Sequence, residues 1–151
     1  MKKIMIVDDN YLSAEGIEKN IDWETLNAEI IHVCYNGTSA IEAMKKEPAD
    51  LIISDIEMPD LDGISMSRQA LEINPMVKII LISAYDKFEY ARRALLLGAL
   101  DYIEKPLDYA YLIQKVKNAF ALMEKEQKNL QLLKQSRPLL TEKFFHTPSV
   151  F

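Results

Sequence analysis

The fold of this chain is decided by residues 51–63, which read LIISDIEMPDLDG. The stretch opens with a short apolar run that ends in the carboxylate of Asp55, and such a run is typical of a central parallel strand buried on both faces. Met58-Pro59 and Asp62-Gly63 are then typical of a turn. We therefore expect a strand that delivers Asp55 to the carboxyl edge of a sheet, where open α/β folds place their ligand sites. The alternative is that Asp55 only caps a turn or a helix.

Length and composition indicate one domain, with room for an appendage. The chain has 151 residues and a net charge of −5, which argues mildly against direct binding of nucleic acid. Its single cysteine, Cys34, excludes an internal disulfide and a cysteine-based metal cluster. No apolar run has membrane-spanning length and the first residues do not form a signal peptide, so we expect a cytoplasmic protein without membrane contact.

Short apolar runs alternate with helical patterns five times along the chain. Strands are expected at residues 4–7, 30–34, 51–55, 78–83 and 102–103. Helices are expected at 11–21, 39–46, 63–73 and 87–97, and a longer one starts at 108 and is ended by Pro138. Repeated β-α units imply a parallel sheet with right-handed crossovers and helices on both faces. The prediction is a doubly wound, flavodoxin-like α/β domain with an extended C-terminal helix.

Polar residues follow the predicted strands, and a parallel sheet brings such strand ends together at one edge. They are Asp8 and Asp9, Asp55, Ser83 and Lys105. Crowded carboxylates resist joint ionisation, and a hard cation such as Mg²⁺ relieves this while leaving positions for phosphate oxygens. Asp55 is then a candidate nucleophile for phosphoryl transfer. The alternatives are that the acidic pair only favours a helix N-terminus and that the lysine lies in a solvated loop.

These motifs resemble those of receiver domains of two-component response regulators, from residue 3 to about 122. The resemblance implies five parallel strands in the order 2-1-3-4-5. It is carried, in chain order, by Asp8-Asp9, Asp55, Met58-Pro59, Asp62-Gly63, Ser83-Ala84 and Lys105-Pro106.

The resemblance also implies roles for individual residues. Asp55 would accept the phosphoryl group. Asp9 and Asp55 would bind Mg²⁺ directly, Asp8 would act mainly through water, and the backbone carbonyl of Glu57 would add a ligand. Lys105 would pair with the phosphoryl group, as expected for an ammonium beside an anion.

Two residues would serve as the switch that responds to phosphorylation. Ser83 would hydrogen-bond the phosphoryl group on activation, and Tyr102 occupies the family's aromatic switch position. The alternative for Tyr102 is that the ring only packs on a short strand. Ser83 stands where threonine is commoner, and Glu57 places a carboxylate beside the site that could raise metal affinity or alter the lifetime of the phosphate.

A narrower resemblance is to receivers that precede an AraC-type helix-turn-helix output domain. It rests on residues 21–24 (IDWE), residues 83–91 (SAYDKFEYA), Gly98 and Asp101-Tyr102. We expect a receiver at 1–122 and, at 123–151, a helical extension and linker toward a missing output domain. DNA would be bound only through that output domain.

The C-terminal helix carries apolar residues near heptad spacing, interrupted at Glu126 and Gln127. The pattern fits a lone helix or a weak homodimer, and we favour the homodimer. The apolar positions are Leu112, Val116, Ala119, Met123, Leu130 and Leu133.

The expected function is that of a regulatory phosphoacceptor, which takes a phosphoryl group from a sensor histidine kinase and catalyses only its own phosphorylation and dephosphorylation. The main alternative is a phosphatase of the haloacid dehalogenase type, but its nucleophile opens an Asp-x-Asp motif on the first strand, whereas here Asp8 and Asp9 are adjacent. A flavin carrier is disfavoured because the same two carboxylates would repel the flavin phosphate.

Overall fold

The computed structural model describes residues 1–84 and 88–144, without the side chains of residues 88, 95 and 136–144. It separates into two units, Met1–Ala119 and Phe120–Phe151. Part of the stretch 83–91 and the end of the predicted linker lie outside the described residues. The elements are β1 (Lys2–Val7), α1 (Tyr11–Asn20), β2 (Ala28–Cys34), α2 (Gly37–Lys46), β3 (Leu51–Asp55), α3 (Gly63–Ile73), β4 (Lys78–Ser83), α4 (Phe88–Leu97), β5 (Asp101–Glu104) and α5 (Tyr109–Phe144).

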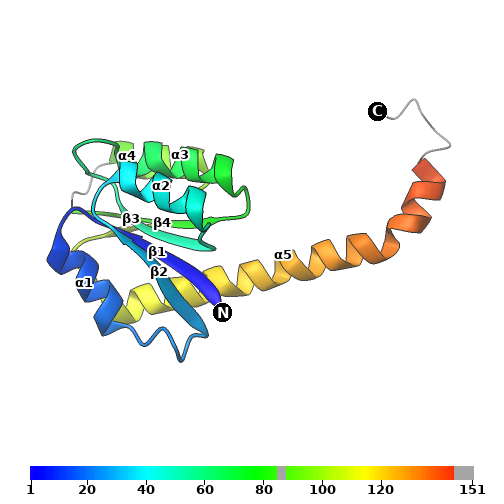
Figure 1. The fold of residues 1–151 in the computed structure, drawn as a ribbon, viewed down its shortest axis with the longest axis horizontal. Coiled ribbons are helices and arrows are strands. Elements are labelled where there is room, and N and C mark those ends of the chain that lie inside the picture. Colours follow the sequence, from blue (N-terminus) through cyan, green and yellow to red (C-terminus); the bar gives the residue numbers. More distant parts are fainter. Residues whose placement is uncertain (85–87, 145–151) are drawn as a thin grey trace. The chain divides into compact units, whose positions relative to one another are not determined.

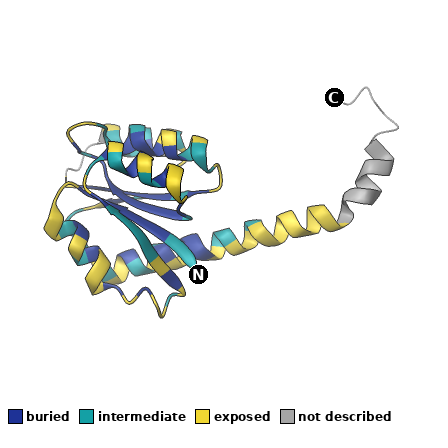
Figure 2. Cartoon of the chain, viewed as in Figure 1, coloured by how far each residue is buried: buried dark blue, intermediate teal, exposed yellow. Residues whose placement is uncertain are grey.

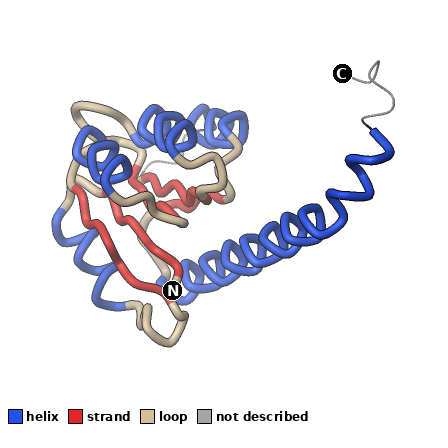
Figure 3. The backbone as a smooth tube through the Cα atoms, turned by 45° about the vertical axis from the view of Figure 1, so that its right-hand side comes forward, coloured by secondary structure: helices blue, strands red, loops and turns tan. Residues whose placement is uncertain are grey.

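The first unit is a doubly wound domain built on five parallel strands in the order β2-β1-β3-β4-β5, as predicted. Helices α2, α3 and α4 cover one face of the sheet, and α1 and the start of α5 cover the other (Figure 1). The strands therefore form a middle layer between helices (Figure 3). Predicted and observed elements agree in type and order, and β2 and β5 extend beyond their predicted ends by up to two residues.

Strand β3 is the centre of the core. All five of its residues are buried, and it pairs with β1 on one side and β4 on the other. Ile52 packs into the apolar cluster on one face of the sheet, and Ile53 is also fully buried. Figure 2 shows the central strands of the sheet in the colour of buried residues. Successive side chains of a strand point to opposite faces of the sheet. Because both faces are covered by helices, an unbroken apolar run is needed to fill both with apolar side chains. The strand thus anchors Asp55, its last residue, to the most buried part of the domain.

Helices α1, α2 and α3 each begin with a side-chain cap in the loop that follows a strand. The side-chain oxygen of Asn10 accepts from the backbone N–H of Leu12 and of Ser13, at 3.0 and 3.1 Å. Asn36 starts α2 and Asp62 starts α3 in the same way. Such caps bond N–H groups that the first turn of a helix leaves without partners. The loops that lead from β1, β2 and β3 into α1, α2 and α3 are therefore held by hydrogen bonds.

Helix α5 does not end where the sequence predicted. It continues through Pro138 to Phe144, so the prediction that this proline ends the helix is wrong. Proline lacks one backbone donor and crowds the preceding turn, which can bend a helix without ending it. In the described parts of the chain, no helix is both long enough and apolar enough to cross a membrane.

Candidate functional site

The carboxyl edge of the sheet gathers the charged residues that the sequence singled out. Asp8 follows β1, Asp55 ends β3 and Lys105 follows β5. The Lys105 ammonium nitrogen lies 3.2 Å from Oδ2 of Asp8 and 3.6 Å from Oδ2 of Asp55. The lysine is therefore held between two carboxylates that come from different strands. It is not a solvated loop residue, since its side chain is only 21% exposed.

Backbone contacts fix the two buried carboxylates. The backbone N–H of Asn10 donates to Oδ1 of Asp8 at 2.9 Å, and the backbone N–H of Ile56 donates to Oδ1 of Asp55 at 2.9 Å. Each carboxylate thus has one oxygen bound to its own loop and the other turned to Lys105. Such bonds orient the carboxylates before any ligand arrives.

Gly63 lets α3 start directly against the phosphoacceptor candidate. Its N–H donates to the carbonyl oxygen of Ile56 at 2.8 Å. A Cβ at this position would collide with the backbone carbonyl oxygen of Asp55, so the close approach requires glycine. The turn motif that follows β3 is therefore part of the support of Asp55.

Three carboxylates form a compact cluster at this edge. Asp8, Asp9 and Asp55 each offer an oxygen, and these oxygens lie within 4.8 Å of one another. Asp8 and Asp55 are buried, whereas Asp9 is exposed and borders solvent. An exposed carboxylate beside two buried ones suits a hard cation that keeps some of its water, so the donor set fits a divalent metal ion.

The electrostatics of the cluster favour a cation. Burial raises the pKa of Asp55 to about 6, the negative charge of Asp8 adds to this, and Lys105 opposes it. Burial by itself lowers the pKa of Lys105, but Asp55 and Asp8 more than compensate and raise it above its ordinary value. The site therefore holds more negative charge than one ammonium group neutralises.

The two predicted switch residues lie on neighbouring strands. Ser83 is fully buried at the end of β4, and its carbonyl oxygen accepts from the backbone N–H of Lys105 at 2.8 Å. Tyr102 is half-buried on β5, packs against the apolar core and lines a cavity of about 210 Å³ beside α4. The backbone of Ser83 is thus bonded to the backbone of Lys105, and the switch roles of Ser83 and Tyr102 both stay predictions.

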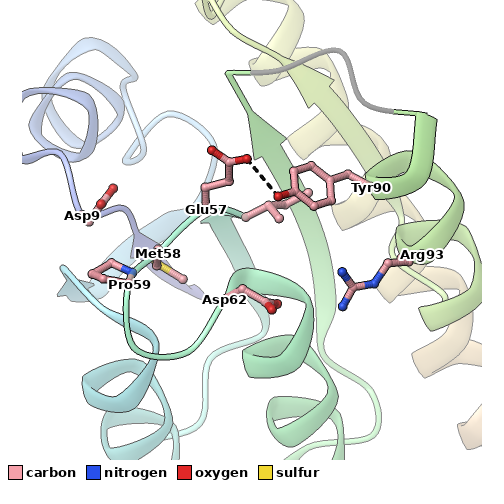
Figure 4. Close-up of a pocket in the computed structure, with 8 residues that line it drawn as sticks. Asp9, Glu57, Met58, Pro59, Asp62, Tyr90 and Arg93 are labelled. Carbon is pink, nitrogen blue, oxygen red and sulfur yellow. Dashed lines mark hydrogen bonds between the residues drawn. The ribbon is translucent and has the colours of Figure 1, made fainter.

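A second cavity, of about 440 Å³, lies between the loop after β3 and helix α4. Across it, the hydroxyl of Tyr90 donates to Oε1 of Glu57 at 2.9 Å (Figure 4). The sequence singled out Tyr90 only as part of the motif 83–91 and did not single out Arg93, which also lines the cavity. The bond joins residues 33 positions apart, so no local pattern could have revealed it. The full lining is Asp9, Ile56, Glu57, Met58, Pro59, Asp62, Tyr90 and Arg93.

Comparison with known proteins gives one consistent family. Residues 4–117 match the family model of the response regulator receiver domain. The chain is 29% identical over 126 residues to the uncharacterized transcriptional regulatory protein YesN of Bacillus subtilis, a match that covers 83% of this chain and 34% of YesN. It therefore spans about a third of the length of that curated relative.

Solved structures agree in fold as well as in sequence. The receiver domain of AraT, a response regulator from Geobacillus stearothermophilus, is 34% identical with a TM-score of 0.79, over 83% of this chain and 98% of that one. A two-component transcriptional regulator AraC from Clostridium phytofermentans is 30% identical with a TM-score of 0.75, over 85% and 99%. The predicted resemblance is thus confirmed, and the phosphatase alternative finds no support. The chain belongs to the response regulator receiver domain family.

Proposed function

We propose that this chain is a phosphorylation-controlled receiver whose phosphoacceptor is Asp55. The observation that carries the proposal is the convergence of Asp8, Asp9 and Lys105 on that carboxylate. Oδ2 of Asp55, the oxygen that does not accept from the backbone of Ile56, faces the ammonium group of Lys105. This oxygen is the natural nucleophile toward phosphorus. Phosphoryl transfer needs little beyond a positioned nucleophile and neutralisation of charge, and both are supplied here.

Mg²⁺ is the proposed cofactor. Asp9 and Asp55 would hold it directly, Asp8 mainly through water, and the backbone carbonyl of Glu57 would complete the protein ligands. When bound, the ion supplies positive charge to the oxygens of the transferring group. Lys105 would pair with another phosphoryl oxygen, and Ser83 would donate its hydroxyl to the phosphorylated form. Tyr102 is the proposed aromatic partner of that switch.

The proposed donor is the phosphohistidine of a sensor kinase in the cytoplasm. YesN is described as a transcriptional regulatory protein, and this chain matches only part of it. We propose that residues 1–122 form the receiver and that residues 123–151 form a helical extension and linker toward a DNA-binding output domain. In this role the chain catalyses only its own phosphorylation and dephosphorylation.

The second unit favours weak self-association. Leu130 and Leu133 lie on α5 with exposed fractions of 48% and 57%. They are three residues apart and so share a helix face, which suits pairing with a second copy. Sedimentation velocity over a range of concentrations tests this. Dimer formation should disappear in the double variant Leu130→Gln/Leu133→Gln, and a concentration-independent monomer in the unmodified chain would refute it.

The phosphoacceptor is tested by intact mass after incubation with acetyl phosphate and Mg²⁺. One phosphoryl group should be gained by the unmodified chain and none by Asp55→Asn. Asp101→Asn is the matched control, since Asp101 pairs with Lys115 away from the cluster, and it should gain one group. An equal gain in Asp55→Asn would overturn the assignment, and repeated turnover of a small phosphate ester would restore the phosphatase alternative.

A further inference from the structure

The bond between Tyr90 and Glu57 crosses the cavity beside the phosphoacceptor. Glu57 belongs to the loop that follows β3, two residues after Asp55, and Tyr90 belongs to α4. Figure 4 shows the Glu57 side chain directed toward the Tyr90 ring, with Asp9 on the opposite side of the cavity. Tyr90, a residue of α4, therefore helps to orient the Glu57 carboxylate.

Glu57 is held apart from the carboxylates proposed to bind metal. The cluster of mutually close oxygens consists of Asp8, Asp9 and Asp55, and within residues 1–84 and 88–144 it does not extend to the Glu57 side chain. Yet the cavity is lined by both Glu57 and Asp9. With Tyr90 removed from the bond, a rotation of the Glu57 side chain within this space would bring its carboxylate toward the cluster.

The cavity also has room for water. Its volume is about 440 Å³, whereas a water molecule in the liquid occupies about 30 Å³. Water in this space would lie beside the loop that leaves Asp55, because Ile56 and Glu57 are part of the lining. A carboxylate that reached the same space could accept a hydrogen bond from a water molecule and orient its oxygen.

We propose that Tyr90 is a positioning residue that prolongs the phosphorylated state by holding Glu57 away from the phosphoryl group. The inference rests on the proposed function, since it concerns hydrolysis of phosphorylated Asp55. In that hydrolysis the water oxygen bonds to phosphorus, and the bond from phosphorus to the Asp55 oxygen breaks. The electron pair returns to the Asp55 carboxylate, and both hydrogens of the water leave with the phosphate as dihydrogen phosphate.

The role of Tyr90 is separated from that of Glu57 by a pair of conservative changes. Tyr90→Phe removes the hydroxyl and keeps the ring that packs against the core. Glu57→Gln keeps an oxygen that can accept from Tyr90 but removes the negative charge that would orient water. Tyr111→Phe is the matched control, because Tyr111 lies on α5 with 47% of its surface exposed.

The test is the decay of the acyl phosphate, followed by intact mass after acetyl phosphate is removed with Mg²⁺ retained. Tyr90→Phe should decay roughly threefold to tenfold faster, a change of the size expected for loss of one typical hydrogen bond. Tyr90→Phe/Glu57→Gln should decay no faster than Glu57→Gln, and Tyr111→Phe should decay like the unmodified chain. Unfolding by urea, measured in parallel, shows whether Tyr90→Phe is folded.

Two results would overturn the inference. One is an unchanged or slower decay in folded Tyr90→Phe. The other is an acceleration that persists in full when Glu57 is already Gln, because the effect would then not act through Glu57. Failure of the proposed function is distinct from both, since the unmodified chain would gain no phosphoryl group at all.

Discussion

The ammonium nitrogen of Lys105 lies 3.2 Å from a carboxylate oxygen of Asp8, a residue 97 positions earlier in the chain. Asp8 is only 2% exposed, so its charge is shielded from water and depends on this partner. Lys105 is the counter-ion of the two buried carboxylates, Asp8 and Asp55.

Lys105→Met should therefore destabilise the metal-free protein. It leaves the buried carboxylates of Asp8 and Asp55 without their cation, which costs about 2–4 kcal/mol. Urea unfolding in EDTA measures the loss. The control is Lys115→Met, whose partner Asp101 is 25% exposed, and this change should destabilise the protein much less, because exposed ion pairs contribute little. An equal loss of unfolding free energy in the two variants would contradict the role of Lys105 as the counter-ion of buried carboxylates.

The charge of Asp55 should make the metal-free protein less stable as pH rises. The pKa of Asp55 is about 6 in the folded chain, against an ordinary value of 3.8, because of burial and Asp8. The folded state thus holds a proton that the unfolded state has lost between these values, so stability falls across that window and stays lower above it. Asp55→Asn should be more stable than the unmodified chain by about 1–2 kcal/mol at pH 7.5, with solvent screening allowed for.

The same comparison near pH 4 is the check on this explanation. There Asp55 is protonated in the folded chain and already partly protonated in the unfolded chain, because pH 4 lies close to the ordinary pKa of 3.8, so the advantage of Asp55→Asn should be much smaller. Urea midpoints at the two pH values, both in EDTA, measure it. A gain of equal size at both values would mean that the asparagine acts through packing.

Mg²⁺ should stabilise the chain, and Asp9 should be needed for this. A ligand present at ten times its dissociation constant adds about 1.4 kcal/mol to the free energy of unfolding. Asp9→Asn should lose most of the gain, and because Asp9 is exposed the change should leave the core intact. Thermal unfolding across a Mg²⁺ titration provides the measurement.

In the same titration, Glu57→Gln distinguishes a contribution of the Glu57 backbone to Mg²⁺ binding from one of its side-chain carboxylate. Only the backbone carbonyl is a proposed ligand, so this variant should keep most of its response to Mg²⁺. A loss as large as that of Asp9→Asn would place the Glu57 carboxylate among the metal ligands.

Gly63→Ala should damage both stability and phosphorylation. The new methyl group collides with the backbone oxygen of Asp55, and since both atoms belong to packed elements the cost should be about 2–4 kcal/mol. Gly16→Ala is the matched control, because its nearest neighbour is the hydroxyl end of Tyr109, a side chain that can move. Urea unfolding and acetyl phosphate labelling should both single out Gly63→Ala.

Much of the fold follows from the sequence because its signals are local. The apolar run before Asp55 has the length and burial of a central strand, and Asn10 and Asp62 follow strands where helix caps are needed. The convergence of Asp8 and Lys105 follows in turn, since parallel strands end at a common edge.

The remaining features depend on distances between elements, which local patterns do not encode. Glu57 meets Tyr90 only because α4 packs beside the loop after β3, and the direction of a long side chain depends on that spacing. Pro138 is a strong local signal against a helix, yet α5 continues through it. The local preference of proline does not decide the structure at Pro138. Proline lacks a backbone N–H, so the helix loses only one backbone hydrogen bond there.

The burial of β3 on both faces limits which parts of the domain can move in response to phosphorylation. A strand enclosed between two layers of side chains has no slack, because protein interiors are packed as densely as crystals. In the proposed role of Asp55 as phosphoacceptor, the strand that carries it has little room to move. We therefore expect the added charge to shift the loops that follow the strands and the helices attached to them, so that a partner would detect a change at the edge of the domain and not in its centre.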